Sequence, residues 1–401
     1  MIAREKDIPY GSKGYPFLGP PCHPVTVSPT CAKKNKGSLS ENIDNPLLTS
    51  PRVDVIQGNT IALFFLVMAA GGYGRPCERT VTLRGKPAGE GRPGRKMRAR
   101  AASPFPEPFM QYKETQMNTR GFSLVREERL SEVSGTVKLW RHDATGAELL
   151  SIVNNDENKC FGATFRTPPK DSTGVAHILE HSVLCGSEKY PVKEPFVELL
   201  KGSLQTFLNA FTFPDKTCYP VASANLQDFY NLVDVYLDAV FFPRIDENCF
   251  QQEGWHIEAD SPAGPLRYKG VVFNEMKGVY SSPDSVLAEQ SQQALFPDTL
   301  YSLDSGGNPE RIPDLTYQAF HDFHSRYYHP SNARFFFWGD DPEDERLRLL
   351  DAALAGYTAR PADSAVPLQP RRDVPRQIEV PYAAAEGEQR ALFTVNWLLG
   401  E

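Results

Sequence analysis

The chain has 401 residues, of which 40% are hydrophobic and 23% are charged, a composition typical of globular proteins and not of disordered or membrane proteins. Its formal net charge of −7 is unevenly distributed: residues 1–104 carry 16 Lys and Arg against 7 Asp and Glu, and residues 105–401 carry 27 against 43. The acidic body (residues 105–401) argues against nucleic-acid binding. We expect the basic head (residues 1–104) to have a separate role.

Cysteine usage and hydropathy exclude two further classes. The seven cysteines are scattered, odd in number and free of any CxxC pair, which argues against a disulfide framework and against a thiolate zinc finger. The longest apolar run covers residues 61–70, whereas a membrane-spanning helix needs about twenty residues. We therefore expect a protein of a reducing compartment without a membrane span.

The basic head has the composition of a leader segment. Residues 1–60 are rich in Pro, Gly, Ser and Lys and have no sustained periodicity, as is typical of disordered segments. Residues 68–104 contain seven Arg and two Lys against only Glu78 and Glu90. Arg-rich, acid-poor leaders of this kind are typical of organelle transit peptides. We predict that residues 1–104 are such a disordered basic leader; a generic basic tail is the alternative.

From about residue 105 the pattern becomes that of a folded domain. Apolar residues alternate in the candidate strands and recur at helical spacing in the candidate helices. In chain order the predicted elements are a hairpin of strands 134–140 and 148–154, a strand at 161–166, a helix at 223–242, a helix at 315–328 and a strand at 333–338. We predict an α+β sandwich with a largely antiparallel sheet, whose first domain covers residues 105–373.

The most informative motif is the HxxEH pattern of residues 177–181. On a helix, His177 and His181 project from one face, one turn apart, so that both imidazoles can bind a single Zn²⁺ ion. Glu180 lies on a neighbouring part of that face, within reach of a water molecule on the metal. This order reverses the HExxH protease motif and is the inverzincin signature. Two surface histidines beside a carboxylate are the alternative interpretation.

A catalytic zinc site needs a third protein ligand and leaves the fourth position to water. The downstream candidates are Glu247, Glu253, Glu258 and Glu275. Glu275 falls in a probable helix at residues 269–278, and Glu253 and Glu258 fall in a segment that resembles the start of a strand. Spacing alone does not choose among the four.

Seven blocks of this sequence resemble the pitrilysin-type (M16) metallopeptidases, specifically their presequence protease branch. The blocks lie between residues 121 and 339 and read TPPKDSTGVAHILEHSVLCGSEKYPVKEPF, LQTFLNAFTFPDKTCYPVAS, DFYNLVDVYLDAVFFP, QEGWHIE, KGVVFNEMKG, SGGNPERIPDLTY and YYHPSNARFFFWG. In this family the glutamate of NEMKG completes the zinc site, which implies Glu275 here. More distant branches have a shorter spacing, near that of Glu258, and an inserted turn around residues 260–266 accounts for the difference.

The resemblance implies a zinc metalloendopeptidase that degrades unstructured peptides, such as cleaved targeting presequences. One Zn²⁺ ion per chain would be held by His177, His181 and Glu275, with Glu180 as general base on the attacking water. Asn209, Ala210 and Phe211 lie in a segment resembling the strand with which the family binds extended substrate. The implied location is the mitochondrial matrix or the chloroplast stroma.

The family is a clamshell of two halves, and this chain corresponds to the first part of it. Residues 374–401 resemble the truncated start of a second M16-like domain, including an expected strand at 391–399. We therefore expect the missing C-terminal half in the same natural chain or in another one. The alternative is a truncated or non-catalytic M16-like subunit that acts as a structural or peptide-binding module. Cys185, four residues after the zinc motif, is either an inert buried thiol or a redox-sensitive one.

Overall fold

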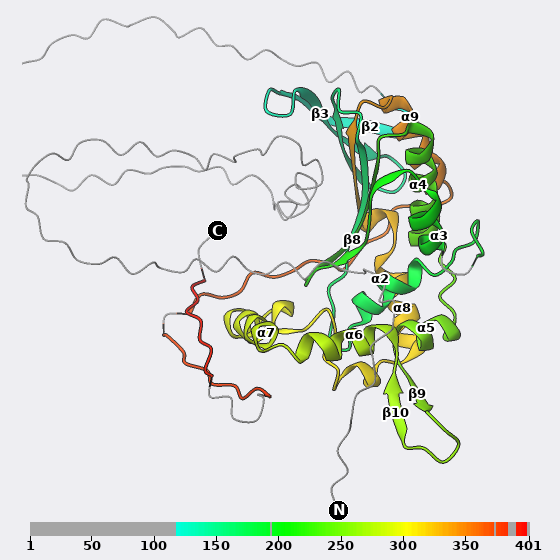
Figure 1. The fold of residues 1–401 in the computed structure, drawn as a ribbon. Coiled ribbons are helices and arrows are strands. Elements are labelled where there is room, and N and C mark those ends of the chain that lie inside the picture. Colours follow the sequence, from blue (N-terminus) through cyan, green and yellow to red (C-terminus); the bar gives the residue numbers. More distant parts are fainter. Residues whose placement is uncertain (1–117, 193–194, 373, 384–389, 399–401) are drawn as a thin grey trace, which may run out of the picture.

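The structure, a computed structural model, describes residues 118–192, 195–372, 374–383 and 390–398 (Figure 1). Among these residues the main feature is a nine-stranded sheet in the order β1-β2-β3-β4-β11-β5-β8-β6, with β7 pairing β8 beside this path. Its pairings are antiparallel apart from that of β4 with β11, for the strands described. The predicted α+β class with a largely antiparallel sheet is therefore confirmed. The strands are β1 (Asn118–Thr119), β2 (Phe122–Leu130), β3 (Gly135–His142), β4 (Glu148–Val153), β5 (Lys159–Arg166), β6 (Gln205–Leu208), β7 (Phe211–Thr212), β8 (Lys216–Ser223) and β11 (Ala333–Gly339).

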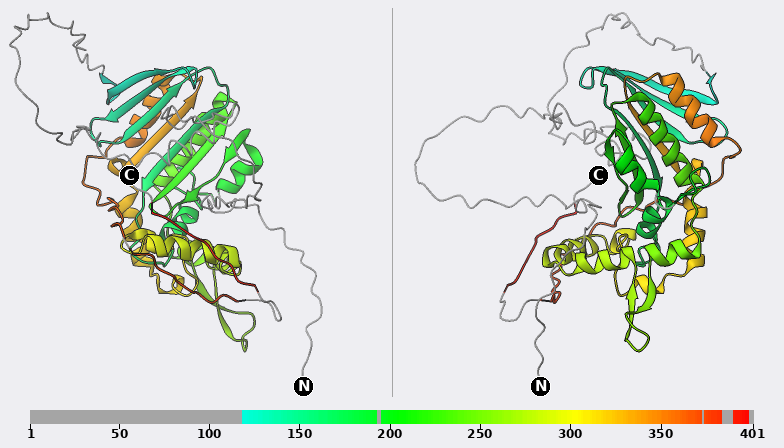
Figure 2. Two further views of the ribbon diagram at one scale, coloured as in Figure 1. Left: turned by 90° about the vertical axis from the view of Figure 1, so that its left-hand side faces the viewer. Right: turned by 45° about the vertical axis from the view of Figure 1, so that its right-hand side comes forward.

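Helices α4 and α9 cover one face of this sheet, and helices α2, α5, α6, α7 and α8 gather at its lower end in the view of Figure 1. A separate antiparallel hairpin of β9 (His256–Ala259) and β10 (Leu266–Lys269) projects below them (Figure 2). The helices are α2 (Val175–Val183), α3 (Pro195–Gly202), α4 (Leu226–Phe241), α5 (Glu247–Glu253), α6 (Val271–Tyr280), α7 (Pro283–Leu295), α8 (Tyr317–Tyr327) and α9 (Glu343–Leu354), with short 3₁₀ turns η1 (Leu300–Ser302), η2 (Ile312–Asp314) and η3 (Pro330–Asn332).

The elements expected from apolar periodicity form where predicted. The hairpin around residues 143–146 is β3–β4, and the strands at 161–166 and 333–338 are β5 and β11. The helix expected at 223–242 is α4, which begins after Asn225, whose side chain accepts a hydrogen bond from the Asp228 N–H, and which ends before Pro243. Glu253 does not start a strand but is the last residue of α5, whereas Glu258 lies on β9 as expected.

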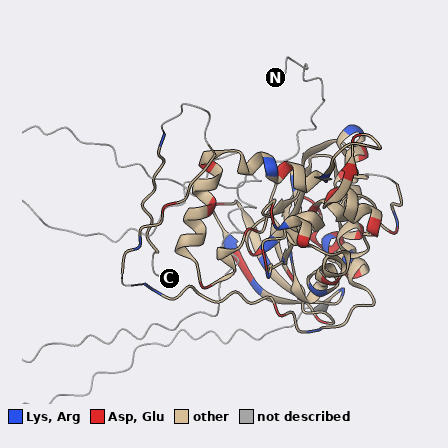
Figure 3. Ribbon diagram, turned by 90° about the horizontal axis from the view of Figure 1, so that it is seen from below, with Lys and Arg blue, Asp and Glu red and all other residues tan. Residues whose placement is uncertain are grey.

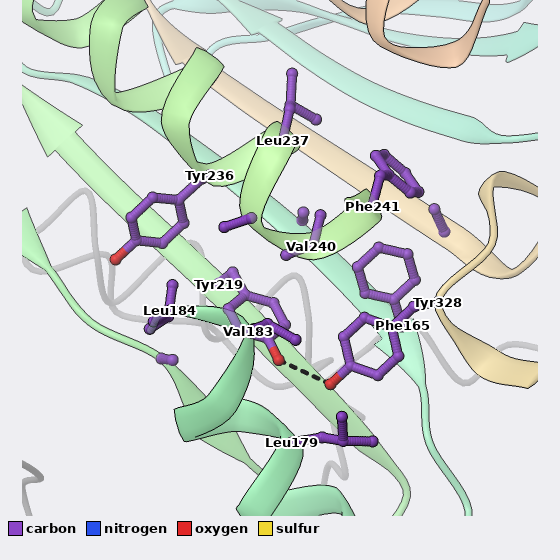
Figure 4. Packing of buried hydrophobic residues seen from close by; sticks show 14 of the residues in the cluster. Phe165, Leu179, Val183, Leu184, Tyr219, Tyr236, Leu237, Val240, Phe241 and Tyr328 are labelled. Atoms are coloured by element: carbon purple, nitrogen blue, oxygen red, sulfur yellow. Dashed lines mark hydrogen bonds between the residues drawn. The ribbon is translucent and has the colours of Figure 1, made fainter. Parts of the chain in front are cut away.

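The core lies between the sheet and its helices. Aromatic side chains from β5, β8 and α4 meet the end of α2 there (Figure 4). The Tyr219 and Tyr328 hydroxyls, both buried, are 2.7 Å apart and hydrogen-bonded, so that their polar atoms are satisfied inside the apolar cluster. Phe165 stacks on Tyr328 with ring centroids 4.9 Å apart. Burying these aromatic side chains fixes α2 against the sheet, which matters because α2 carries the HxxEH motif.

The two ends of the chain differ from the folded domain between them in how much of them the structure describes. The predicted leader, residues 1–104, lies outside the described residues, as does the apolar run at 61–70. In the described part of residues 374–398 there is neither helix nor strand. The strand expected at 391–399 is therefore wrong for residues 391–398, which have no strand partner in the described chain. None of the helices within the described residues is long and apolar enough to span a membrane.

A buried ion pair ties α9 to the sheet. The Arg346 guanidinium donates to both carboxylate oxygens of Asp341, at 2.9 and 2.6 Å, and neither side chain is exposed to solvent. The same guanidinium also donates to the Ser151 hydroxyl and to the main-chain carbonyls of Ile152 and Gly339. All N–H groups of the guanidinium thus have acceptors inside the protein. Removing the Arg346 side chain therefore leaves the buried Asp341 carboxylate without its counter-charge.

We expect Arg346→Met to lower the free energy of unfolding by about 3–5 kcal/mol, because breaking a buried ion pair strands one charge in the interior. The matched control is Arg348→Met on the same helix, whose partly exposed pair with Glu345 should contribute less than about 1 kcal/mol. Denaturant unfolding followed by circular dichroism measures both. Equal losses for the two variants would contradict the role assigned to Arg346.

Candidate metal centre

Helix α2 places the two histidines of the motif side by side. His177 and His181 are four residues apart, and their ring centroids lie 5.0 Å from each other. The helix begins after Gly174, whose φ of 70° lies in the left-handed region that favours glycine. Eight of its nine residues are buried, and its apolar side chains join the core while the imidazoles face the opposite way, towards α6.

Helix α6 brings Glu275 to the same place. Glu275 Oε2 lies 3.8 Å from His177 Nε2 and 3.7 Å from His181 Nε2. One donor atom of each of the three residues lies within 4.8 Å of the other two. The helix predicted around Glu275 is confirmed, and among the four candidate glutamates Glu275 is the one with an oxygen within 4 Å of both histidines.

The second ring nitrogen of each histidine is held by an oxygen atom. His177 Nδ1 lies 2.9 Å from the Gly306 carbonyl oxygen, which can only accept, and His181 Nδ1 lies 3.3 Å from Glu253 Oε2. Both contacts favour the tautomer with hydrogen on Nδ1, which leaves the Nε2 lone pairs directed towards Glu275. Two imidazole nitrogens and one carboxylate oxygen form the donor set of a catalytic zinc site, so the residues present fit that ion.

The protonation tendencies of the two histidines differ. Burial and the neighbouring His181 lower the pKa of His177 to about 3, which keeps its ring neutral, the form that binds metals. Burial also disfavours charge on His181, but the hydrogen bond to Glu253 and the charges of Glu180 and Glu275 outweigh it and raise the pKa of His181. Binding a cation at Nε2 would therefore displace a proton from His181.

Glu180 is buried beside the donor group. Burial raises the pKa of its carboxyl to about 7, against the opposing effect of His181. Thr212 in β7, next to Phe211 of the predicted substrate segment, lies near this carboxyl and also opposes the rise of its pKa. A carboxylate with a pKa near neutrality can both accept and return a proton, as general base catalysis requires.

The other glutamates are placed differently. Glu258 is exposed and pairs with Lys269 and His256 on the β9–β10 hairpin, and Glu247 is exposed in the first turn of α5. Glu253 is buried, and it contacts His181 Nδ1 and not the Nε2 atom that faces Glu275. Glu253 is therefore placed to orient a ligand, a role that the sequence analysis did not assign to it.

A cavity of about 370 Å³ opens onto the donor group. Glu180, His181 and Glu275 line it, together with Leu184 directly after α2 and with apolar side chains of α3. Asn209 and Ala210 also line the cavity, in the short connection between β6 and β7, whereas Phe211 lies in β7 and is not among its lining residues. The structure thus brings two of the three predicted substrate-binding residues to the site.

Cys185 lines the cavity as well. Its thiol donates to the His181 main-chain carbonyl and that of Cys249 to the Ser182 carbonyl, and both cysteines are partly buried free thiols. The Cys249 contact, burial and the nearby Glu253 charge all raise the pKa of Cys185, which makes the thiol a poor nucleophile. The inert-thiol interpretation is the one that this environment favours.

Two family models match this chain. The model described as insulinase (peptidase family M16) matches residues 162–277, and the one described as peptidase M16 inactive domain matches residues 314–400. The chain therefore belongs to the M16 peptidase family. Helix α2, both histidines and Glu275 all lie within the first matched region.

Within this family the chain is a homologue of presequence proteases. It is 58% identical over 288 residues to presequence protease 1, chloroplastic/mitochondrial, of Arabidopsis thaliana, covering 70% of this chain and 27% of that protein. It is 48% identical to protein HypA of Clostridium perfringens, covering 73% and 30%, and 44% identical to the mitochondrial presequence protease of Xenopus laevis, covering 70% and 28%. The chain thus spans less than a third of the length of these relatives. A crystal structure of pitrilysin aligns with 64% of this chain and 26% of its own, at 20% identity and a TM-score of 0.47.

The contact between Glu253 and His181 predicts a measurable effect on metal affinity. We expect Glu253→Gln to weaken zinc binding about 10–100-fold, because the carboxylate fixes the His181 tautomer and raises its basicity. Glu258→Gln, on the exposed hairpin, should leave the affinity unchanged. Competition with a chromophoric chelator measures both values. A loss confined to Glu258→Gln would show that the wrong glutamate has been placed at the site.

Proposed function

We propose that this protein is a zinc metalloendopeptidase that degrades unstructured peptides, such as cleaved organelle presequences. The observation that carries this proposal is the convergence of His177, His181 and Glu275, two of which line one cavity together with the buried Glu180. Membership of the M16 family and the similarity to presequence proteases support both the reaction and the substrate class.

The roles within the site follow from its geometry. His177, His181 and Glu275 would hold one Zn²⁺ ion through two Nε2 atoms and a carboxylate oxygen. When bound, zinc supplies Lewis acidity to the peptide carbonyl and to the attacking water. Glu180 accepts the proton of that water and returns it to the nitrogen of the leaving amine, so that the proton is conserved over the cleavage.

The substrate would bind as an added strand. β6 lies at the edge of the sheet, and Asn209, Ala210 and Phe211 follow directly after it, next to the cavity. An extended peptide at this edge can form main-chain hydrogen bonds, which depend little on side-chain identity. This mode of binding suits unfolded peptides of varied sequence. Asn209 and Ala210 would contact the peptide near the cleaved bond, and Phe211 would support the strand.

The charge distribution is compatible with cationic substrates. Residues 105–401 carry 43 acidic against 27 basic residues, and Figure 3 shows the two kinds interspersed over the elements visible from below. A net negative body attracts Arg-rich presequences over long range. The relatives' names place them in mitochondria or chloroplasts, and we propose the mitochondrial matrix or the chloroplast stroma for this protein, with residues 1–104 as its import leader.

The proposed organisation has two domains after the leader. Residues 105–373 would form the zinc-binding domain, and residues 374–401 would begin a second M16-like domain. Because the relatives are more than three times as long as the matched region, we propose that efficient cleavage needs further segments, in the same chain or in another one. The second candidate function is a non-catalytic peptide-binding subunit. Only the small share of the relatives' length that this chain covers favours it, and it predicts no cleavage even with zinc bound.

Glu180→Gln separates catalysis from metal binding. We expect this variant to keep one zinc ion per chain and to lose cleavage by at least about 100-fold, the lower range of a general base contribution. Zinc content by atomic emission and cleavage of a fluorogenic unstructured peptide, with and without a chelator, are the measurements.

Asp284→Asn, in the first turn of α7, is a control of the same charge change and should leave both values unchanged. Full turnover by Glu180→Gln would refute the assigned role. Zinc binding without chelator-sensitive cleavage, both by the unmodified chain and by a longer version that adds the missing C-terminal half, would favour the non-catalytic alternative.

A further inference from the structure

The turn at residues 304–307 reaches the metal centre from a distant part of the sequence. Its Gly306 carbonyl is the oxygen that holds His177 Nδ1, 129 positions away along the chain. Nothing in the motif at residues 177–181 points to this turn. The position of this carbonyl decides which ring nitrogen of His177 faces Glu275.

Asp304 fixes the shape of this turn. Its Oδ1 atom accepts from the main-chain N–H of Gly306 at 2.9 Å and from that of Gly307 at 3.2 Å. The Asp304 side chain is buried, with a residue exposure of 7%, so water does not replace these bonds. One carboxylate oxygen therefore holds the two peptide units on either side of Gly306 Cα, the second of which contains the Gly306 carbonyl.

The other oxygen of Asp304 connects the turn to α6. The Tyr280 hydroxyl donates to Asp304 Oδ2 at 2.6 Å, and Tyr280 is the last residue of the helix that carries Glu275. The Asp304 N–H in turn donates to the Ser172 hydroxyl, just before α2. Asp304 thus contacts both segments that supply the donor group, although it is not one of the donors.

Steric contact leaves the turn little freedom on the side facing α2. A Cβ atom added at Gly174 would lie 2.8 Å from the Gly306 carbonyl oxygen and 2.8 Å from Gly307 Cα. Both Gly174 and Gly307 have φ angles in the left-handed region, 70° and 105°. The turn backbone therefore packs directly on the backbone at the start of α2, and a shift of the turn moves the Gly306 carbonyl relative to His177.

We propose that Asp304 is a positioning residue: by holding the Gly306 carbonyl against His177 Nδ1, it fixes the ring orientation with which His177 presents Nε2 to a zinc ion. This inference rests on the proposed zinc site. It assigns a role to a residue that lies 127 positions from His177 and contacts neither the substrate cavity nor a donor atom.

Three variants test the proposal. Asp304→Ala removes the acceptor of both turn N–H groups and should weaken zinc binding about 10–100-fold, as expected for loss of an outer partner of a ligand. Asp304→Asn keeps an oxygen at Oδ1 and should restore the affinity to within about threefold of the unmodified chain. Asp314→Ala, on the exposed η2 turn of the same connection, should change nothing.

A second readout does not depend on zinc. In ¹⁵N NMR spectra of the metal-free chain, the Nδ1–H signal of His177, assigned by its absence in His177→Gln, should report one tautomer in the unmodified chain and in Asp304→Asn. In Asp304→Ala it should shift towards the average of two tautomers. Circular dichroism checks the fold, and if Asp304→Ala does not fold, Tyr280→Phe should still weaken zinc binding about threefold through loss of one hydrogen bond.

The outcomes separate the two claims. Unchanged zinc affinity and unchanged Nδ1–H signal in folded Asp304→Ala, or unchanged affinity in Tyr280→Phe where Asp304→Ala does not fold, would overturn the positioning role. An equal loss in Asp314→Ala would overturn it as well, since the effect would then be general. If the unmodified chain binds no zinc, the proposed function fails, and the NMR signal alone decides whether Asp304 positions His177.

Discussion

The structure depends on keeping three donor atoms within 4.8 Å of one another on two helices that lie far apart in the sequence. His177 and His181 come from α2 and Glu275 from α6, and no main-chain hydrogen bond between these two helices is needed to bring them together. Burial of α2 against the sheet fixes one side, and the turn carrying Gly306 fixes the other. A metal site requires this rigidity because its ligands must meet at about 2 Å from one point.

Local features of the fold and site are readable from the sequence because they depend on short-range periodicity. The spacing of His177 and His181 follows from the helical repeat, and the hairpin, α4 and β11 follow from alternating or 3.6-residue apolar patterns. Short-range periodicity does not identify the third metal ligand. Only the resemblance to a family points to Glu275, because the spacing of the residues leaves four glutamates as candidates.

The remaining features depend on tertiary contacts that carry no local signal. Glu253 is the last residue of α5 and contacts His181 Nδ1. Its neighbours in the sequence do not predict this contact. The partner of His177 is a main-chain carbonyl, which every residue possesses, so no residue type marks it. The strand expected at residues 391–399 illustrates the converse, because alternating apolar residues form a strand only where a partner edge exists. Phe393, Val395 and Trp397 are exposed in the structure.

X-ray absorption at the zinc edge of the zinc-loaded chain tests the central claim most directly. We expect a first shell of nitrogen and oxygen at about 2.0–2.2 Å with the outer-shell pattern of two imidazoles, and loss of one oxygen ligand in Glu275→Gln. A sulfur shell at about 2.3 Å would contradict it, because it would place the ion on the Cys185 and Cys249 thiols instead. A spectrum identical in the unmodified chain and in Glu275→Gln would contradict the assignment of Glu275.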